Sequence, residues 1–305
     1  MTEEERPWGL TDEAHPELFD IRGRPPTSLK KPGQLPEEAI RKYFEDGYVI
    51  VRDVFSREQL DPCKDAINKA VEELAQKLYK AGKIKNLYSD HGFNDRLTLI
   101  EEEFPGANIL LHKIGHLPEA TVWLPLIDSD EQNGCLEVAH QGHKTGRVGE
   151  HLACYRDTWY VWITEDEMEK KLEIDPKTDF VVCEVPYGGV LLFNNLIPHR
   201  SLQNKSNKIR WSLDLRFQRP DLPVGFYGLK HGVLLRSPSK PDHVINWKDF
   251  DGRDKIQREA CVEDKTADEF STTIQGPWMT KWKIAHVNRH MEGLSRDKGA
   301  TWHKP

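Results

Sequence analysis

From Thr121 onward the apolar residues of this chain recur with a period of two, and this change constrains the fold more than any other feature. Strands are predicted over residues 121–127, 135–138, 159–163, 180–185, 190–193 and 210–217. Asn133-Gly134 and Gly188-Gly189 provide turn residues between them. Many short strands separated by such turns are typical of an antiparallel sandwich or barrel.

The N-terminal half has helical periodicity instead. Residues 37–44 form an amphipathic pattern, Asp46-Gly47 predicts a turn, and residues 48–51 are rich in β-formers. Ser56 and Gln59 have the spacing of a capping box, which predicts the start of a helix over residues 57–80. A short helix is predicted over residues 97–104. The chain therefore belongs to the α+β class, with a helical N-terminal layer.

Both ends of the chain are polar and irregular. Residues 1–35 contain five prolines and many charges, so they predict an extended N-terminal arm. We assign residues 36–218 to one α+β domain. Residues 219–305 are predicted to be a C-terminal extension that packs on the core, with a helix near residues 279–292.

Composition excludes several classes of partner. The chain has 43 Lys and Arg against 50 Asp and Glu in 305 residues, for a net charge of -7, which argues against nucleic acid or an anionic membrane. No apolar run reaches the ~20 residues that span a bilayer. Five scattered cysteines without a CxxC pair favour a reducing compartment. We expect a cytoplasmic protein acting on a small molecule, and its oligomeric state is left open.

The strongest functional signal lies at the ends of two predicted strands. His199 follows an apolar strand, and Arg210 begins an alternating one. A neutral imidazole is the commonest metal ligand, and a guanidinium binds a carboxylate in bidentate fashion. Ser201 would share the side of His199 if the first strand continued. Two alternatives stay open: His199 bonded to a neighbouring hydroxyl or backbone group, and Arg210 in an internal salt bridge with Asp214, Asp128 or another acid.

Two further patterns are weaker. The acidic run over residues 128–135 lacks the glycine and glutamate positions of a calcium loop, so an acidic hairpin turn is predicted. His140 and His143 form an HxxH pair in a glycine-containing loop. For both we favour packing or backbone hydrogen bonding over metal binding.

Three stretches carry a resemblance to a known family. They are residues 43–51 with the helix that follows, residues 122–128 running into 133–138, and residues 198–201 running to 210–212. Over residues 37–217 the chain resembles the phytanoyl-CoA dioxygenase family of non-haem iron(II), 2-oxoglutarate-dependent oxygenases. The resemblance implies a double-stranded β-helix, or jelly-roll, core.

The resemblance also implies roles for the three site residues. His199 corresponds to the second iron-binding histidine of the family. Arg210 corresponds to the arginine that pairs with the distal carboxylate of 2-oxoglutarate, and Ser201 to the hydroxyl that assists it. The family couples oxidative decarboxylation of 2-oxoglutarate to hydroxylation, with iron held by two histidines and one carboxylate.

The chain departs from the family where the first histidine and the carboxylate should form an HxD or HxE pair. Only His15 and His290 are followed by an acid two residues later, and neither lies where the family places its pair. Residues 112–120 run directly into the strand at residue 121, which an internal deletion in an isoform or a mis-spliced gene model would explain. His116 and Glu119 are poor substitutes, because residues three apart on a strand face opposite ways.

These observations predict an incomplete jelly roll with unpaired strand edges. The family cofactors are iron(II) and 2-oxoglutarate, but we expect this chain not to retain iron, and we assign no catalytic residue. The expected function is that of an ancestral dioxygenase that hydroxylated a small molecule and is now weakly active or inactive. The alternatives are a non-catalytic pseudoenzyme or binding protein with a carboxylate pocket, and a cupin-type protein whose other histidines converge on His199.

Overall fold

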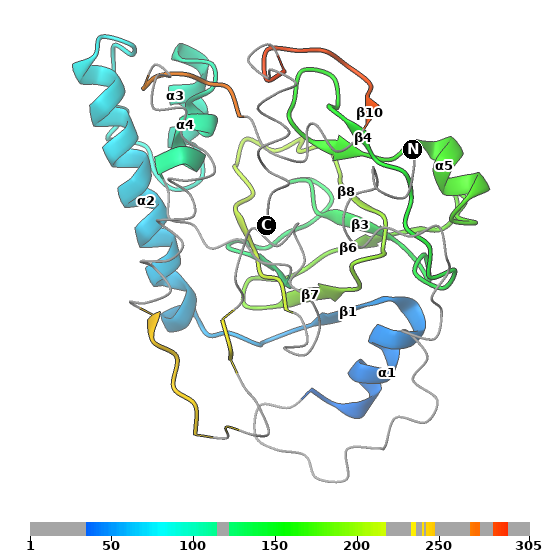
Figure 1. Cartoon of the computed structure of the whole chain (residues 1–305). Coiled ribbons are helices and arrows are strands. Elements are labelled where there is room, and N and C mark those ends of the chain that lie inside the picture. The colour runs from blue at the N-terminus through cyan, green and yellow to red at the C-terminus, as the bar shows by residue number, and fades with distance from the viewer. Residues whose placement is uncertain are drawn as a thin grey trace. The chain divides into compact units, whose positions relative to one another are not determined.

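The computed structural model describes residues 35–114, 122–217, 233–235, 240, 242–247, 269–274 and 283–291 (Figure 1). These residues form two compact units. The larger contains described residues 35–149 and 163–217, and the smaller contains residues 150–162 with the described residues after 217. Each unit is considered by itself. The predicted boundaries at residues 35 and 218 stay predictions.

The helical layer begins as the sequence predicts. Helix α1 (Glu37–Asp46) ends at Gly47, whose φ of 87° lies in the left-handed region, and β1 (Tyr48–Val51) follows. A Cβ atom at Gly47 would lie 2.4 Å from Ile197 Cδ1 and 2.6 Å from His143 Nδ1, so both sterics and conformation require glycine here. Helix α2 (Arg57–Lys80) starts after Ser56 with the predicted capping box.

Two more helices complete the layer around α2. Helix α3 (Arg96–Glu103) matches the short helix predicted over residues 97–104, whereas α4 (Ala107–Ile114) was not predicted. The buried face of α2 consists of apolar side chains at helical spacing, and α3 and α4 contact this helix. That face comprises Leu60, Ile67, Val71, Leu74, Ala75 and Leu78.

Two antiparallel sheets form the rest of the larger unit. The four-stranded sheet has the order β1, β7 (Val190–Phe193), β2 (Val122–Pro125) and β9 (Ser212–Asp214). The three-stranded sheet has the order β6 (Phe180–Cys183), β3 (Leu136–Ala139) and β8 (His199–Ser201). A short helix, α5 (Glu165–Lys170), precedes β6.

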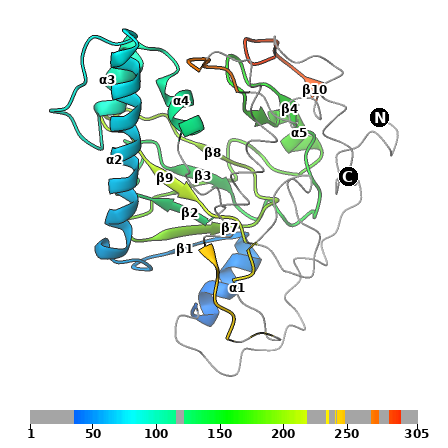
Figure 2. The same ribbon diagram turned by 60° about the vertical axis from the view of Figure 1, so that its left-hand side comes forward.

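The sheets face each other across one hydrophobic core. Trp123 and Leu191 of the four-stranded sheet pack in the same cluster as Leu136, Val138 and Cys183 of the three-stranded sheet. On the opposite face of the four-stranded sheet, Leu60 of α2 packs in a second cluster with β2 and β7 (Figure 2). The predicted fold class, α+β with a jelly-roll core and an N-terminal helical layer, is confirmed.

Among the described residues, both sheets of the larger unit have two edge strands: β1 and β9 in the four-stranded sheet, and β6 and β8 in the three-stranded sheet. A complete jelly roll has eight strands. Among the described residues, β1 is the one strand of these sheets that comes from the N-terminal helical layer. Among the described residues, β8 pairs only with β3, and β9 pairs only with β2. Of the four edge strands, β8 and β9 are the two next to the candidate site, and the prediction that a deletion left strand edges unpaired stays a prediction.

The smaller unit contains a three-stranded sheet of β4 (Leu152–Ala153), β5 (Val161–Trp162) and β10 (Lys283–Ile284). The prediction of a helix near residues 279–292 is wrong for its described part, since residues 283–291 form β10 and a turn. Parallel pairing of β10 with β4 opposes helix formation there. His290 is buried in this unit, 5.5 Å from the ring of Trp159, which supports packing over metal binding.

Four predicted strands are shorter than expected, and those over 121–127 and 180–185 are reduced to β2 and β6. The strand predicted over 159–163 is reduced to β5. The strand predicted over 210–217 is reduced to β9, so Arg210 lies two residues before the strand and does not begin it. Among the helices of the described residues, none has the length and apolar character needed to cross a bilayer.

Candidate functional site

Arg210 and Ser201 come together, although they lie on different sheets. Nη2 of Arg210 donates a hydrogen bond to Oγ of Ser201 on β8 at 3.0 Å, and Nη1 donates to Oγ of Ser212 on β9 at 3.0 Å. The guanidinium thereby bridges the open edges of the two sheets. Ser201 and Arg210 are thus neighbours, and Ser212 joins them.

The surroundings of Arg210 leave its charge incompletely compensated. The guanidinium lies 5.1 Å from the ring centroid of Trp123, a favourable cation–π contact. Burial lowers the pKa of Arg210, and the charges of Asp214 and Cys135 only partly oppose this effect. The Nε atom is buried and has no hydrogen-bond partner among the described residues. A buried donor without an acceptor is costly, so the site favours an added acceptor.

The internal salt bridge considered for Arg210 does not form with either candidate acid. Asp214 influences Arg210 electrostatically without a salt bridge, and Oδ1 of Asp128 instead accepts a hydrogen bond from the backbone of Tyr187 at 2.8 Å. Within the part of the chain that the structure describes, this guanidinium has an unused donor and forms no ion pair with an acid, an arrangement that suits an exogenous carboxylate. The residues present therefore fit the distal carboxylate of 2-oxoglutarate.

His199 lies on β8 opposite Val138, with its side chain exposed. Its Nδ1 is 2.9 Å from the backbone oxygen of Ile197, and its ring is 4.7 Å from that of Phe193. If Nδ1 carries the proton, it donates to this oxygen and Nε2 is the nitrogen with a free lone pair. Such an orientation is typical of a metal-binding histidine.

The partners that a metal would need do not join His199. Among the residues that the structure describes, no three His, Cys, Asp or Glu side chains converge on one position. A facial triad requires two histidines and a carboxylate. The described residues therefore do not fit iron, and a cupin-type cluster of histidines around His199 is likewise not seen within them. His116, Glu119 and the junction at residue 121 lie outside the described residues, as does His15.

The two weaker patterns have structural roles. His143 is 2% exposed, and its Nε2 lies 2.9 Å from the backbone oxygen of Phe44, which confirms backbone bonding. Burial lowers the pKa of His143. His140 lies 3.9 Å from a carboxylate oxygen of Asp46.

The acidic run forms the expected turn. Oδ1 of Asp130 accepts hydrogen bonds from the backbone nitrogens of Gln132 and Asn133, both at 2.9 Å. These local bonds use the carboxylate to stabilise the turn, as an Asx turn does.

Two parts of the site were missed in the sequence. Trp123 was read only as a strand residue, although the alternation of β2 places it on the inner face. A loop between α2 and α3 also supports the segment of Arg210: the backbone oxygen of Asn94 accepts from Ile209 N at 2.6 Å, and that of Phe93 accepts from Trp211 Nε1 at 2.7 Å. No local pattern reveals contacts between residues so far apart in the sequence.

Comparison with known proteins agrees with the resemblance found in the sequence. The model of the phytanoyl-CoA dioxygenase family matches residues 111–212, which include all three predicted site residues. The resemblance to this family that the sequence predicts is therefore confirmed over residues 111–212, and the cofactors of the family are iron and 2-oxoglutarate. No curated protein matches the chain.

Solved structures of several oxygenases are similar to this chain. EvdO2 from Micromonospora carbonacea var. aurantiaca, complexed with 2-oxoglutarate, has 12% identity and a TM-score of 0.34, over 63% of this chain and 98% of that one. EctD from S. alaskensis with bound iron has 14% identity and a TM-score of 0.32, over 61% and 82%. The carbocyclase SnoK from nogalamycin biosynthesis has 17% identity and a TM-score of 0.32, over 58% and 81%. Likenesses at this level say nothing about individual residues of the site.

Proposed function

We propose that this member of the phytanoyl-CoA dioxygenase family binds 2-oxoglutarate through Arg210 and Ser201 but turns over weakly or not at all. Its ancestral reaction would be hydroxylation of a small molecule. One observation supports the proposal above all others: among the described residues the guanidinium has an unused buried donor, while His199 belongs to no group of three or more potential metal ligands.

The residues of this chain would act on the cosubstrate as a carboxylate clamp. Arg210 would pair with the distal carboxylate, and Ser201 and Ser212 would hold the guanidinium in place. Trp123 would cover one face of the guanidinium and limit the contact of that group with water. Bound iron would supply oxygen activation in the family, and His199 is the one residue we assign to it.

A turnover assay tests the inactivity. Purified protein is supplied with iron(II), ascorbate, oxygen and 2-oxoglutarate, and succinate is measured against a protein-free control. We expect succinate at background. Succinate that exceeds background and disappears in His199→Ala would refute this part of the proposal.

The second candidate function is that of a non-catalytic binding protein that retains a carboxylate pocket. The buried Nε donor of Arg210, which has no hydrogen-bond partner among the described residues, favours it, because a carboxylate can bind there without a metal. Titration of 2-oxoglutarate into the wild type and Arg210→Ala distinguishes a carboxylate pocket from none. Equal, weak affinities of the two proteins would eliminate the pocket.

We attribute the missing iron ligands to an internal deletion before residue 121. The open edges of β8 and β9 support this origin, since a deletion of the strands beside them would expose both. Sequencing the transcript tests it: an additional exon between the codons of Ala120 and Thr121 would identify the chain as an isoform. Transcripts and genomic sequence without such an exon would contradict the deletion.

We also propose that the protein is cytoplasmic and that it binds neither nucleic acids nor membranes. The four described cysteines are free thiols, which supports a reducing compartment. Fractionation of cells that express the full chain would test the location. The predicted N-terminal arm and C-terminal extension would be tested by limited proteolysis, which should cleave first outside residues 36–218.

A further inference from the structure

The segment around Arg210 is held by a loop that belongs to the helical layer. Ile209 precedes Arg210 and donates its backbone N–H to Asn94 O at 2.6 Å. Trp211 follows Arg210 and donates its indole N–H to Phe93 O at 2.7 Å, with the two rings 5.7 Å apart. Two consecutive carbonyls of the loop therefore hold the residues on both sides of the guanidinium.

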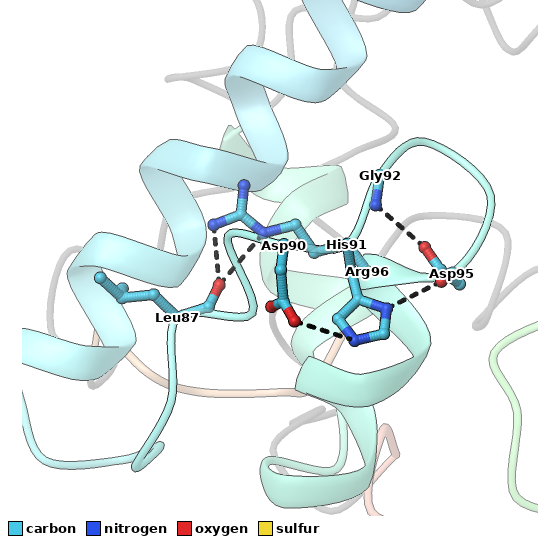
Figure 3. A network of polar contacts seen from close by, with 6 residues as sticks. All are labelled: Leu87, Asp90, His91, Gly92, Asp95 and Arg96. Atoms are coloured by element: carbon cyan, nitrogen blue, oxygen red, sulfur yellow. Dashed lines mark hydrogen bonds and ion pairs between the residues drawn. The ribbon is translucent and has the colours of Figure 1, made fainter.

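The loop itself is fixed to the helices at its base. Arg96 is 9% exposed, and its Nε and Nη2 both donate to Leu87 O, at 3.1 and 2.7 Å (Figure 3). Its Nη1 lies 2.6 Å from a carboxylate oxygen of Glu72 on α2. Tyr88 has a φ of 51°, a left-handed conformation that a non-glycine residue keeps only where its surroundings hold it, and its hydroxyl donates to Glu103.

At the tip, one pair of side chains closes the loop. His91 Nδ1 lies 2.8 Å from Asp95 Oδ2, and Asp95 Oδ1 accepts the backbone N–H of Gly92 at 3.0 Å (Figure 3). Asp90 lies 3.9 Å from His91 Nε2. Since Asp95 directly follows Asn94, the His91–Asp95 pair adjoins the carbonyls that hold Ile209 and Trp211.

We propose that residues 88–96 are a positioning loop for Arg210, closed by the His91–Asp95 pair, and that opening this pair weakens carboxylate binding at the guanidinium. The inference rests on the proposed function, because it concerns the affinity of the same pocket. His91 and Asp95 are positioning residues that touch no ligand. The loop acts through Asn94 and Phe93 on the backbone that carries Arg210.

The pair makes the position of Arg210 depend on pH. The hydrogen bond to Asp95 raises the pKa of His91, and the charges of Asp95 and Asp90 act in the same direction, while the ring of Tyr88 packs at 6.2 Å. A raised histidine pKa means that the charged pair is complete below the ordinary histidine pKa and is lost as pH rises through the folded value. Carboxylate affinity should therefore fall as pH rises through that window.

Calorimetric titration of 2-oxoglutarate into full-length protein between pH 6 and pH 8.5 tests the inference. The proteins are wild type, Asp95→Asn, His91→Gln, Arg210→Ala and Asp65→Asn, which removes an exposed charge of α2 outside the loop. We expect Asp95→Asn to weaken binding roughly two- to tenfold at pH 6, the range for coupling through a contact network. His91→Gln should bind with an affinity that no longer changes with pH, and Asp65→Asn should match wild type.

The outcomes separate the two proposals. If Arg210→Ala binds as well as wild type, the pocket and the loop both fail. If Arg210→Ala loses binding but His91→Gln keeps the wild-type affinity and pH profile, the pocket stands and the positioning loop is overturned. Should Asp95→Asn not fold, His91→Gln decides alone, since His91 is partly exposed at the surface. His199→Gln should retain the wild-type pH dependence, and its loss there would assign the effect to His199 and overturn the inference.

Discussion

Arg210 and His199 both lie next to an edge strand, since His199 begins β8 and Arg210 precedes β9 by two residues. Around Arg210 the structure supplies two serine hydroxyls, an indole face and a supporting loop. Around His199 it supplies one backbone carbonyl and one aromatic ring among the described residues. The difference indicates that a binding side chain keeps its position only where neighbouring residues hold it. This contrast is what the proposed function expects of a carboxylate site kept without its metal site.

Arg210→Ala should have the largest effect on 2-oxoglutarate binding. Truncating one member of a buried charge pair costs roughly 2–5 kcal/mol, so 2-oxoglutarate affinity should fall at least about 30-fold. Calorimetric titration measures this loss, and Arg210→Lys serves as the matched variant that keeps the charge without the fork. A pocket that binds equally well in Arg210→Ala would place the carboxylate elsewhere.

Gly47→Ala should test the scaffold beneath His199 separately from the site. The new methyl group would meet Ile197 Cδ1 at 2.4 Å on a backbone with φ of 87°, so we expect a loss of about 2 kcal/mol of stability. Chemical denaturation measures the loss. The folded variant should bind 2-oxoglutarate as wild type does. A weakened affinity would mean that the scaffold of the metal half also supports the carboxylate half.

Ser201→Ala should have a smaller effect on the same pocket. It removes one of the two hydroxyls that hold the guanidinium, and a single hydrogen bond contributes about 1 kcal/mol, or roughly fivefold in affinity. Ser212→Ala is the matched control on the other sheet and should weaken binding similarly. If neither variant changes the affinity, Arg210 is positioned by the loop and by Trp123 alone.

His199→Ala should have the smallest effect. His199 is exposed and has no metal partners among the described residues, so the change in stability should stay within about 0.5 kcal/mol. Elemental analysis should find the same sub-stoichiometric iron in both proteins. Stoichiometric iron in wild type that is absent in His199→Ala would show that ligands exist beyond the described residues.

Local chemistry explains which elements could be predicted from the sequence. Helix α2 begins and ends where the capping box and Gly82 place it, and β7 is a short apolar strand between two turn signals. Helix α4 was missed because it has only eight residues and follows α3 after a short turn, so the two helices were read as one mixed segment. The helix near residues 279–292 failed because pairing with β4 determines the conformation of residues 283–284.

The candidate site likewise has parts that could be predicted from the sequence and parts that could not. The association of Arg210 with Ser201 was implied by the family resemblance alone, and the structure brings the two together. The loop at Phe93 and Asn94 could not be predicted, because its contacts join residues 118 positions apart in the sequence. Tertiary contacts of this kind leave no periodic trace in either segment.

The central claim is that the carboxylate pocket remains although the metal site is lost. Its most direct test is a titration of 2-oxoglutarate performed twice, once with chelator and once with saturating iron(II). The account predicts one site whose affinity is the same in both titrations and is lost in Arg210→Ala. Binding that appears only with iron(II), and that His199→Ala abolishes, would contradict it.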